Sequence, residues 1–106
     1  MKTLSSPQIN VKEKTIEFSL HDDNAAHVSF VGASQVSLAG TFNHWAHDEL
    51  LMQQDNEGAW RIQIPMLPKG KYHYKFFVDD KVWMEDIYNP YREPDGSSGF
   101  NSILIV

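Results

Sequence analysis

The sequence predicts an all-β fold: an antiparallel β-sandwich that is immunoglobulin-like in the broad sense. Three observations support this prediction. The chain has 106 residues, which suits a single domain. About seven or eight short stretches alternate between apolar and polar residues, with turn signals about every 8–12 residues. No window of convincing length has the periodicity of a helix. An up-and-down barrel is the alternative all-β architecture.

The composition limits the class of protein. The sequence is 42% hydrophobic and 12% aromatic, which is enough for a packed core. It has no cysteine, so disulfides and thiolate zinc sites are excluded. The formal net charge is −5 and no basic stripe is present, so we expect no nucleic-acid partner. Without an apolar run of about 18 residues or a signal peptide, we expect a cytoplasmic protein that does not contact a membrane.

The first strand follows a polar N-terminal stretch. Residues 1–13 are expected to be a flexible segment or an edge segment. Residues 15–20 alternate strictly, which predicts a half-buried strand with its large apolar side chains inward and Ser19 outward. Residues 21–24 have turn chemistry, and residues 27–31 are the next predicted strand.

A strand at residues 36–40 leads to an exposed-looking tryptophan. Alternation predicts that Ser37 and Ala39 lie on the face opposite the apolar residues. Gly40 ends the alternation and indicates a bulge or a close backbone approach. Trp45 then stands just past the strand, where a loop can hold it on a rigid scaffold. It is either a flat platform for a sugar ring or a cap on the core.

The middle of the chain predicts a hairpin. Residues 46–51 are expected to form one short helical turn or an irregular loop. Residues 55–58 have the chemistry of a hairpin turn. Residues 60–65 alternate, with Trp60 on the apolar face, which assigns this tryptophan to the core. Residues 68–70 are a further turn signal.

A second hairpin carries two candidate binding residues. Residues 71–78 alternate with aromatic side chains on the inner face and Lys75 on the outer face. Lys75 is either a solvated strand lysine or a donor to sugar hydroxyls. Residues 79–81 form a tight turn into residues 82–84. If the two neighbours of Trp83 face the core, Trp83 faces solvent and can serve as a binding platform.

The C-terminal part contains one long irregular stretch and one strand. Residues 85–99 have no periodicity, which predicts a loop of about fifteen residues; such loops are usually functional or mobile. Residues 100–106 are predicted to be the final strand. Asn101 lies near its start and can both donate and accept hydrogen bonds, as vicinal hydroxyls require. The alternative is an ordinary turn residue.

No pattern of residues predicts catalysis or metal binding. His44 and His47 lack a third convergent ligand. The acidic residues between 79 and 86 belong to turns of a small sandwich rather than to the cleft of a glycoside hydrolase. No phosphate loop or nucleophile elbow is present. We therefore expect no enzyme activity, no cofactor and no metal in this chain.

Three motifs stand in order along the chain: Val-Ser-Leu-Ala-Gly-Thr-Phe-Asn-His-Trp at 36–45, Leu-Pro-Lys-Gly-Lys-Tyr-His-Tyr-Lys-Phe-Phe-Val-Asp at 67–79, and Val82-Trp83 with the stretch 86–90 and Asn101. Over about residues 28–106 they resemble carbohydrate-binding module family 48. That family includes the glycogen-binding domain of the AMP-activated protein kinase β subunit. It also includes the N-terminal modules of isoamylase and branching enzymes of glycoside hydrolase family 13.

The resemblance implies an immunoglobulin-like sandwich of the early set type, which we place at residues 14–106. It implies non-catalytic binding of α-1,4-glucans such as glycogen, starch or maltooligosaccharides. The sugar-binding positions of the family fall on Trp45, Lys75, Trp83 and Asn101.

The sequence departs from the family just before Asn101. The family has a leucine and a threonine in this loop, where the present chain has Ser97-Ser98-Gly99-Phe100. This departure and the aromatic-rich stretch 88–91 support an alternative hypothesis. In that alternative, the chain is an interaction or structural module that packs on a glycoside hydrolase barrel or a kinase subunit without binding sugar.

Overall fold

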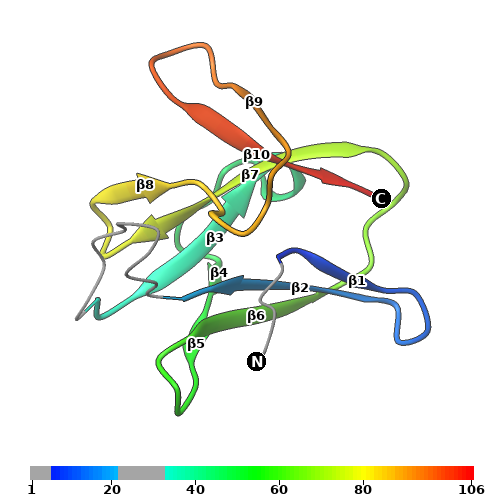
Figure 1. The fold of residues 1–106 in the computed structure, drawn as a ribbon, viewed down its shortest axis with the longest axis horizontal. Helices are drawn as coiled ribbons and strands as arrows, with labels where there is room; N and C mark the ends of the chain where they lie inside the picture. The colour runs from blue at the N-terminus through cyan, green and yellow to red at the C-terminus, as the bar shows by residue number, and fades with distance from the viewer. Residues whose placement is uncertain (1–5, 22–32) are drawn as a thin grey trace.

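A computed structural model of the chain describes residues 6–21 and 33–106. They form ten strands and one short 3₁₀ helix, with no α-helix in these two ranges. The strands make two antiparallel sheets (Figure 1), which confirms the predicted β-sandwich. The predicted strand at 27–31 and most of the turn at 21–24 lie outside the described residues. Within the described part, no helix is long and apolar enough to cross a membrane.

The prediction of seven or eight strands was too low because four strands of only two or three residues were not recognised: β1 (Gln8–Asn10), β4 (Leu50–Leu51), β5 (Gln53–Gln54) and β9 (Arg92–Pro94). Alternation cannot be recognised over so few residues. Of residues 46–51, where a short helical turn or an irregular loop was expected, residues 46–49 form an irregular turn and the last two form β4. The 3₁₀ helix lies earlier, at Thr41–Asn43.

The smaller sheet has the strand order β1-β2-β6-β5, with β2 at Thr15–Leu20 and β6 at Trp60–Pro65. Ile16 lies opposite Ile64 and Leu20 lies opposite Trp60, so both strands present apolar residues to the same face. Strand β1 pairs with β2 at the edge of this sheet. The division into a segment at 1–13 and a domain at 14–106 stays a prediction.

The larger sheet has the order β4-β3-β7-β10-β9, with β3 at Val36–Gly40, β7 at Lys71–Val78 and β10 at Phe100–Ile105. Strand β8 (Val82–Met84) pairs with the C-terminal half of β7, and β10 pairs with its N-terminal half. The central strand β7 therefore connects most of this sheet.

The long irregular loop predicted at residues 85–99 contains a strand and is tied to the core. Strand β9 pairs with β10 at the edge of the sheet, where a proline is tolerated. The Tyr74 hydroxyl donates to Asp86 (2.7 Å), and the Asn89 amide donates to the Tyr74 oxygen (3.0 Å) and to the Ile103 carbonyl (2.8 Å). Burial raises the pKa of Asp86. This network fixes the segment that leads to β9.

The core lies between the sheets. Its buried residues are Ile16, Phe18, Leu20, Val36, Leu38, Met52, Trp60, Ile64, Tyr74, Phe76, Val78 and Leu104. The inward faces predicted for β2, β6 and β7 are confirmed. Phe18 and Tyr74 join the two sheets by an edge-to-face contact, with ring centroids 4.9 Å apart. Full burial of such a side chain stabilises the fold by about 1.5–3 kcal/mol.

Three small residues predicted to face outward are buried: Ser19, Ser37 and Ala39. The Ser19 amide donates to the Ser6 hydroxyl (3.1 Å), so the N-terminal segment covers this position. Ser37 lies opposite Leu51 on one side and Phe77 on the other. Alternation identified the faces correctly but not the larger neighbours that cover the small side chains.

Gly40 allows a close backbone approach, as predicted. A Cβ atom at this position would lie 2.4 Å from the His73 carbonyl oxygen. The Asn43 side chain then holds the 3₁₀ turn, since it accepts from the Gly40 amide (3.0 Å) and donates to the Ala46 carbonyl (3.1 Å). These contacts fix the chain just before and after Trp45.

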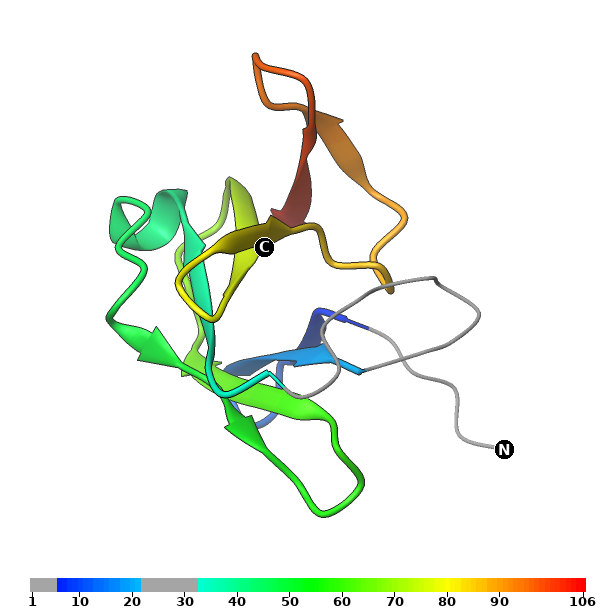
Figure 2. The same cartoon turned by 90° about the vertical axis from the view of Figure 1, so that its left-hand side faces the viewer.

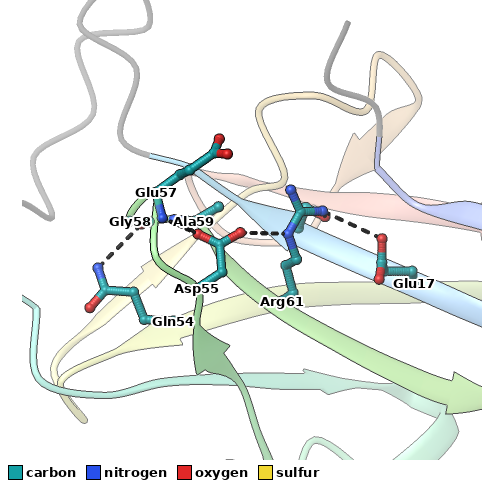
Figure 3. A network of polar contacts seen from close by, with 8 residues as sticks. Glu17, Gln54, Asp55, Glu57, Gly58, Ala59 and Arg61 are labelled. Atoms are coloured by element: carbon teal, nitrogen blue, oxygen red, sulfur yellow. Dashed lines mark hydrogen bonds and ion pairs between the residues drawn. The ribbon is translucent and has the colours of Figure 1, made fainter. Parts of the chain in front are cut away.

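The hairpin turn predicted at residues 55–58 joins β5 to β6 (Figure 3). The Asp55 carboxylate accepts from the backbone amides of Glu57 (2.8 Å) and Ala59 (3.0 Å). Its other oxygen accepts from Nε of Arg61 (2.9 Å), whose Nη1 also lies 3.5 Å from Glu17. These contacts hold the pKa of Asp55 well below its usual value, at about 2.

Candidate functional site

An open hollow of about 350 Å³ lies on the outer face of the larger sheet. Its lining residues are Trp45, Lys75, Trp83, Asp95, Ser97 and Asn101. All four predicted binding residues are thus brought together, although they come from the loop after β3 and from strands β7, β8 and β10. Asp95 and Ser97, in the turn between β9 and β10, were not predicted.

Trp83 is held outward by a tight hairpin. Asp79 and Asp80 both have left-handed backbone conformations, with φ of 53° and 54°, as the tightest hairpin turns require. Trp83 pairs in register with Phe77, and the two rings stack with centroids 4.2 Å apart. Phe77 therefore supports one face of the indole. Trp83 is 42% exposed. The exposure of Trp83 agrees with its predicted outward orientation.

Of the two neighbours of Trp83, only one behaves as predicted. Met84 packs against the core. Val82 is 52% exposed, because it lies next to the hairpin turn at the end of the sheet.

Trp45 closes one side of the hollow. Its φ of 61° is left-handed, and its amide donates to the Gly40 carbonyl (2.8 Å). Its ring lies 6.2 Å from that of Trp83 at an interplanar angle of 79°. Among the described residues, the ring contact of Trp45 is with Trp83 and not with a core aromatic residue. The two indoles thus form a corner with two apolar walls.

One of the two histidines considered as metal ligands, His47, has other partners. The ring of His47 packs edge-on against Phe77, with centroids 5.2 Å apart, and its Nδ1 lies 3.8 Å from Asp80. No group of three or more His, Asp or Glu residues that could hold a metal occurs within residues 6–21 and 33–106. His47 instead extends the row of aromatic rings behind Trp83.

The polar wall of the hollow is an ion pair. Nζ of Lys75 lies 2.7 Å from the Asp95 carboxylate, and the side chains are only 16% and 15% exposed. The other oxygen of Asp95 accepts from the amides of Ser97 (2.8 Å) and Gly99 (3.3 Å). The hydrogen bond from Lys75, followed by that from the Ser97 amide, holds the pKa of Asp95 below its usual value.

Asn101 completes the rim. It pairs with Glu93 in the β9–β10 ladder and is partly buried. In the described part of the chain, its side-chain amide has no hydrogen-bond partner. An amide group that is fixed on a strand and free of other bonds can donate to and accept from a ligand.

The two residues that sequence reasoning missed belong to a recognisable pattern. The segment Asp95-Gly96-Ser97-Ser98-Gly99 begins with an aspartate that accepts from amides two and four residues later. The predicted turn at Asp55 has the same arrangement. Comparing these two segments could have identified Asp95 as a turn-forming residue, but not its contact with Lys75.

The chemistry of the hollow suits a neutral ligand with apolar faces and a polar edge. Two indoles supply flat apolar surface, while the lysine and the asparagine supply hydrogen bonds, which is how pyranose rings are recognised. The lining includes one carboxylate, Asp95, whereas glycoside hydrolysis uses two. The arrangement therefore suits the binding of a sugar ring.

Comparison with known proteins agrees with this chemistry. Residues 29–106 match the family model described as the glycogen recognition site of AMP-activated protein kinase. The chain is 39% identical over 59 residues to the beta-1 subunit of 5'-AMP-activated protein kinase from Rattus norvegicus. It is 36% identical over 59 residues to the beta-2 subunit from Homo sapiens. Each match covers 56% of this chain and 20% of the subunit, so it spans about a fifth of the relative's length.

The family match covers most of the chain and includes every residue that lines the hollow. The sandwich and the three motifs are consistent with it. The chain therefore belongs to the family of the glycogen recognition site of AMP-activated protein kinase, a family of carbohydrate-binding modules.

Proposed function

We propose that this chain is a non-catalytic module that binds α-1,4-glucans, such as glycogen, starch or maltooligosaccharides, by stacking on Trp45 and Trp83. Lys75 and Asn101 orient the sugar hydroxyls. The observation that carries this proposal is the convergence of these four residues, from four separate elements, around one open hollow. The family match and the kinase-subunit relatives support the same ligand class.

In this proposal the apolar face of one glucose ring lies on the free face of Trp83. Phe77 supports the opposite face of the indole, so little side-chain freedom is lost when the sugar binds. Trp45 stands nearly perpendicular, at 79°. An α-1,4-glucan curves, so its successive rings are not coplanar, and two walls at an angle can contact adjacent rings.

The test is calorimetric titration of the folded chain with maltoheptaose, with cellohexaose as the control for linkage. Trp45→Ala and Trp83→Ala are each expected to weaken maltoheptaose binding about tenfold or more, because stacking aromatic residues dominate such interfaces. Tyr91→Ala is the matched control, since Tyr91 is 69% exposed and lies outside the hollow. Unchanged affinity in both tryptophan variants would show that the site is wrong.

A second candidate function is an interaction module that packs on a kinase subunit or a glycoside hydrolase domain. A separate surface favours it: Tyr91, Ile105 and Ile9 are 69%, 60% and 41% exposed and line a second hollow of about 220 Å³. Exposed apolar clusters of this kind are typical of protein interfaces. This hypothesis predicts that the folded chain does not bind glucan. It also predicts a stable complex with a kinase subunit or a glycoside hydrolase domain, which Tyr91→Ala weakens in size-exclusion chromatography.

A further inference from the structure

We propose that Asp95 sets the charge specificity of the hollow: by pairing with Lys75 it restricts the site to uncharged glucans and excludes phosphorylated or otherwise anionic ones. This inference rests on the proposed function, because it concerns the ligand of the same site. Asp95 acts here as a specificity-determining residue through Lys75.

The charges that line the hollow cancel. Lys75 and Asp95 are its two charged lining residues, and they have opposite signs. The side chains are 16% and 15% exposed and lie 2.7 Å apart. Solvent and salt screen such a pair less than they screen a pair on the open surface. An unpaired ammonium group at this position would attract a phosphate or carboxylate group, and Asp95 removes that attraction.

The Asp95 carboxylate is held in place by the backbone of its own turn as well as by Lys75. One oxygen accepts from the amides of Ser97 and Gly99, which leaves the other oxygen for Lys75. Lysine has three N–H donors, and Asp95 is the one side-chain partner of Lys75 in the described part of the chain. Lys75 is therefore held in place with donors left for neutral hydroxyl groups.

Glu93, in the strand β9 that leads to Asp95, offers a matched control. Glu93 binds Lys71 (2.6 Å) and His73 (2.7 Å). Both Glu93 and Lys71 are at least 40% exposed, and neither lines the hollow. Glu93→Gln changes the net charge of the protein by the same amount as Asp95→Asn and also removes the carboxylate partner of a β7 lysine. Glu93 lies outside the hollow, is more exposed than Asp95 and has His73 as a second partner, so Glu93→Gln controls for the change in net charge and for the loss of a lysine's carboxylate partner.

The experiment compares calorimetric affinities for β-cyclodextrin and its mono-6-phosphate. The wild type is expected to bind the neutral sugar more tightly. In Asp95→Asn the amide oxygen can still accept from the turn amides, but the charge of Lys75 is no longer balanced. The ratio of the two affinities should then shift towards the phosphate about threefold or more, while Glu93→Gln leaves it unchanged. An unshifted ratio in Asp95→Asn, or an equal shift in Glu93→Gln, would overturn the inference.

Lys75→Met gives an independent test that does not depend on the folding of Asp95→Asn. It leaves the Asp95 carboxylate unbalanced, so the ratio should move in the opposite direction, further towards the neutral sugar. A shift towards the phosphate would contradict the proposal. If the folded wild type binds neither sugar, the proposed function fails, and this inference fails with it. If the wild type binds β-cyclodextrin and the ratios do not move, only this inference fails.

Discussion

Two turns of the same design lie at opposite ends of the molecule, at residues 55–59 (green) and 95–99 (orange to red) in Figures 1 and 2. In each, the leading aspartate accepts from the backbone amides two and four residues later. In each, its own amide donates to the carbonyl at the end of the turn, over 2.8 Å for Asp55 and 3.0 Å for Asp95. Each carboxylate also binds one basic side chain.

The difference lies in the basic residue. Asp55 binds Arg61, which follows it closely on the same hairpin, and the two side chains are 34% and 33% exposed. Asp95 binds Lys75 from a different hairpin, and that pair is about half as exposed and lines the hollow. A local turn motif thus serves one hairpin in the first case and completes a candidate binding site in the second. The identity and origin of the partner, rather than the turn, distinguish the two regions.

The largest expected difference between the two turns appears when the aspartate of each turn is replaced by alanine. Asp95→Ala should weaken maltoheptaose binding about tenfold, because both the turn that positions Ser97 and the partner of Lys75 are lost. Asp55→Ala should leave the affinity unchanged and lower the Tm by a few degrees. Calorimetric titration and thermal unfolding of both variants measure the two effects. Equal losses of affinity would show that the two turns are not functionally distinct.

Glycine variants sharpen the comparison with a smaller effect. Gly58 and Gly96 have left-handed φ angles of 88° and 85°, and neither would place a Cβ closer than 3.9 Å to a neighbouring atom. Alanine at either position should cost about 1–2 kcal/mol of unfolding free energy through backbone strain alone. Urea unfolding measures this cost.

Only Gly96→Ala is expected to weaken maltoheptaose binding, about two- to fivefold, because the strained turn carries Ser97. Gly58→Ala is its control. A loss of affinity in Gly58→Ala, or none in Gly96→Ala despite the expected loss of stability, would contradict the separation of the two regions.

The smallest expected effect is the loss, at low pH, of the stabilisation that Asp55 contributes. The hydrogen bond from Arg61, followed by those from the Ala59 and Glu57 amides, lowers the pKa of Asp55 from 3.8 to about 2 in the folded state. The ionised carboxylate therefore stabilises the fold above about pH 4, and this contribution is lost as the pH falls towards 2. The wild type should unfold at a Tm a few degrees above that of Asp55→Asn at pH 6, and the difference should become much smaller as the pH falls to 2. A difference that is as large at pH 2 as at pH 6 would exclude ionisation as its cause.

Sequence reasoning worked where structure follows from local periodicity. Strands β2, β6, β7 and β8 were predicted with their bounds, because side chains alternate between the two faces of any strand. Strand β9 was missed, because three residues with a proline show no alternation. The burial of Ser37 was also missed, because the side chains that cover it come from β4 and β7. Alternation assigns a face but does not say what lies on it.

The candidate site divides in the same way. The family motifs identified Trp45, Lys75, Trp83 and Asn101, since each motif is a continuous segment whose residue types and spacing can be recognised. Only the tertiary structure brought these residues to one hollow and added Asp95 and Ser97 to its lining. It also decided which basic residue each aspartate turn binds. Those contacts depend on the register and packing of strands far apart in the chain, and no single segment contains that information.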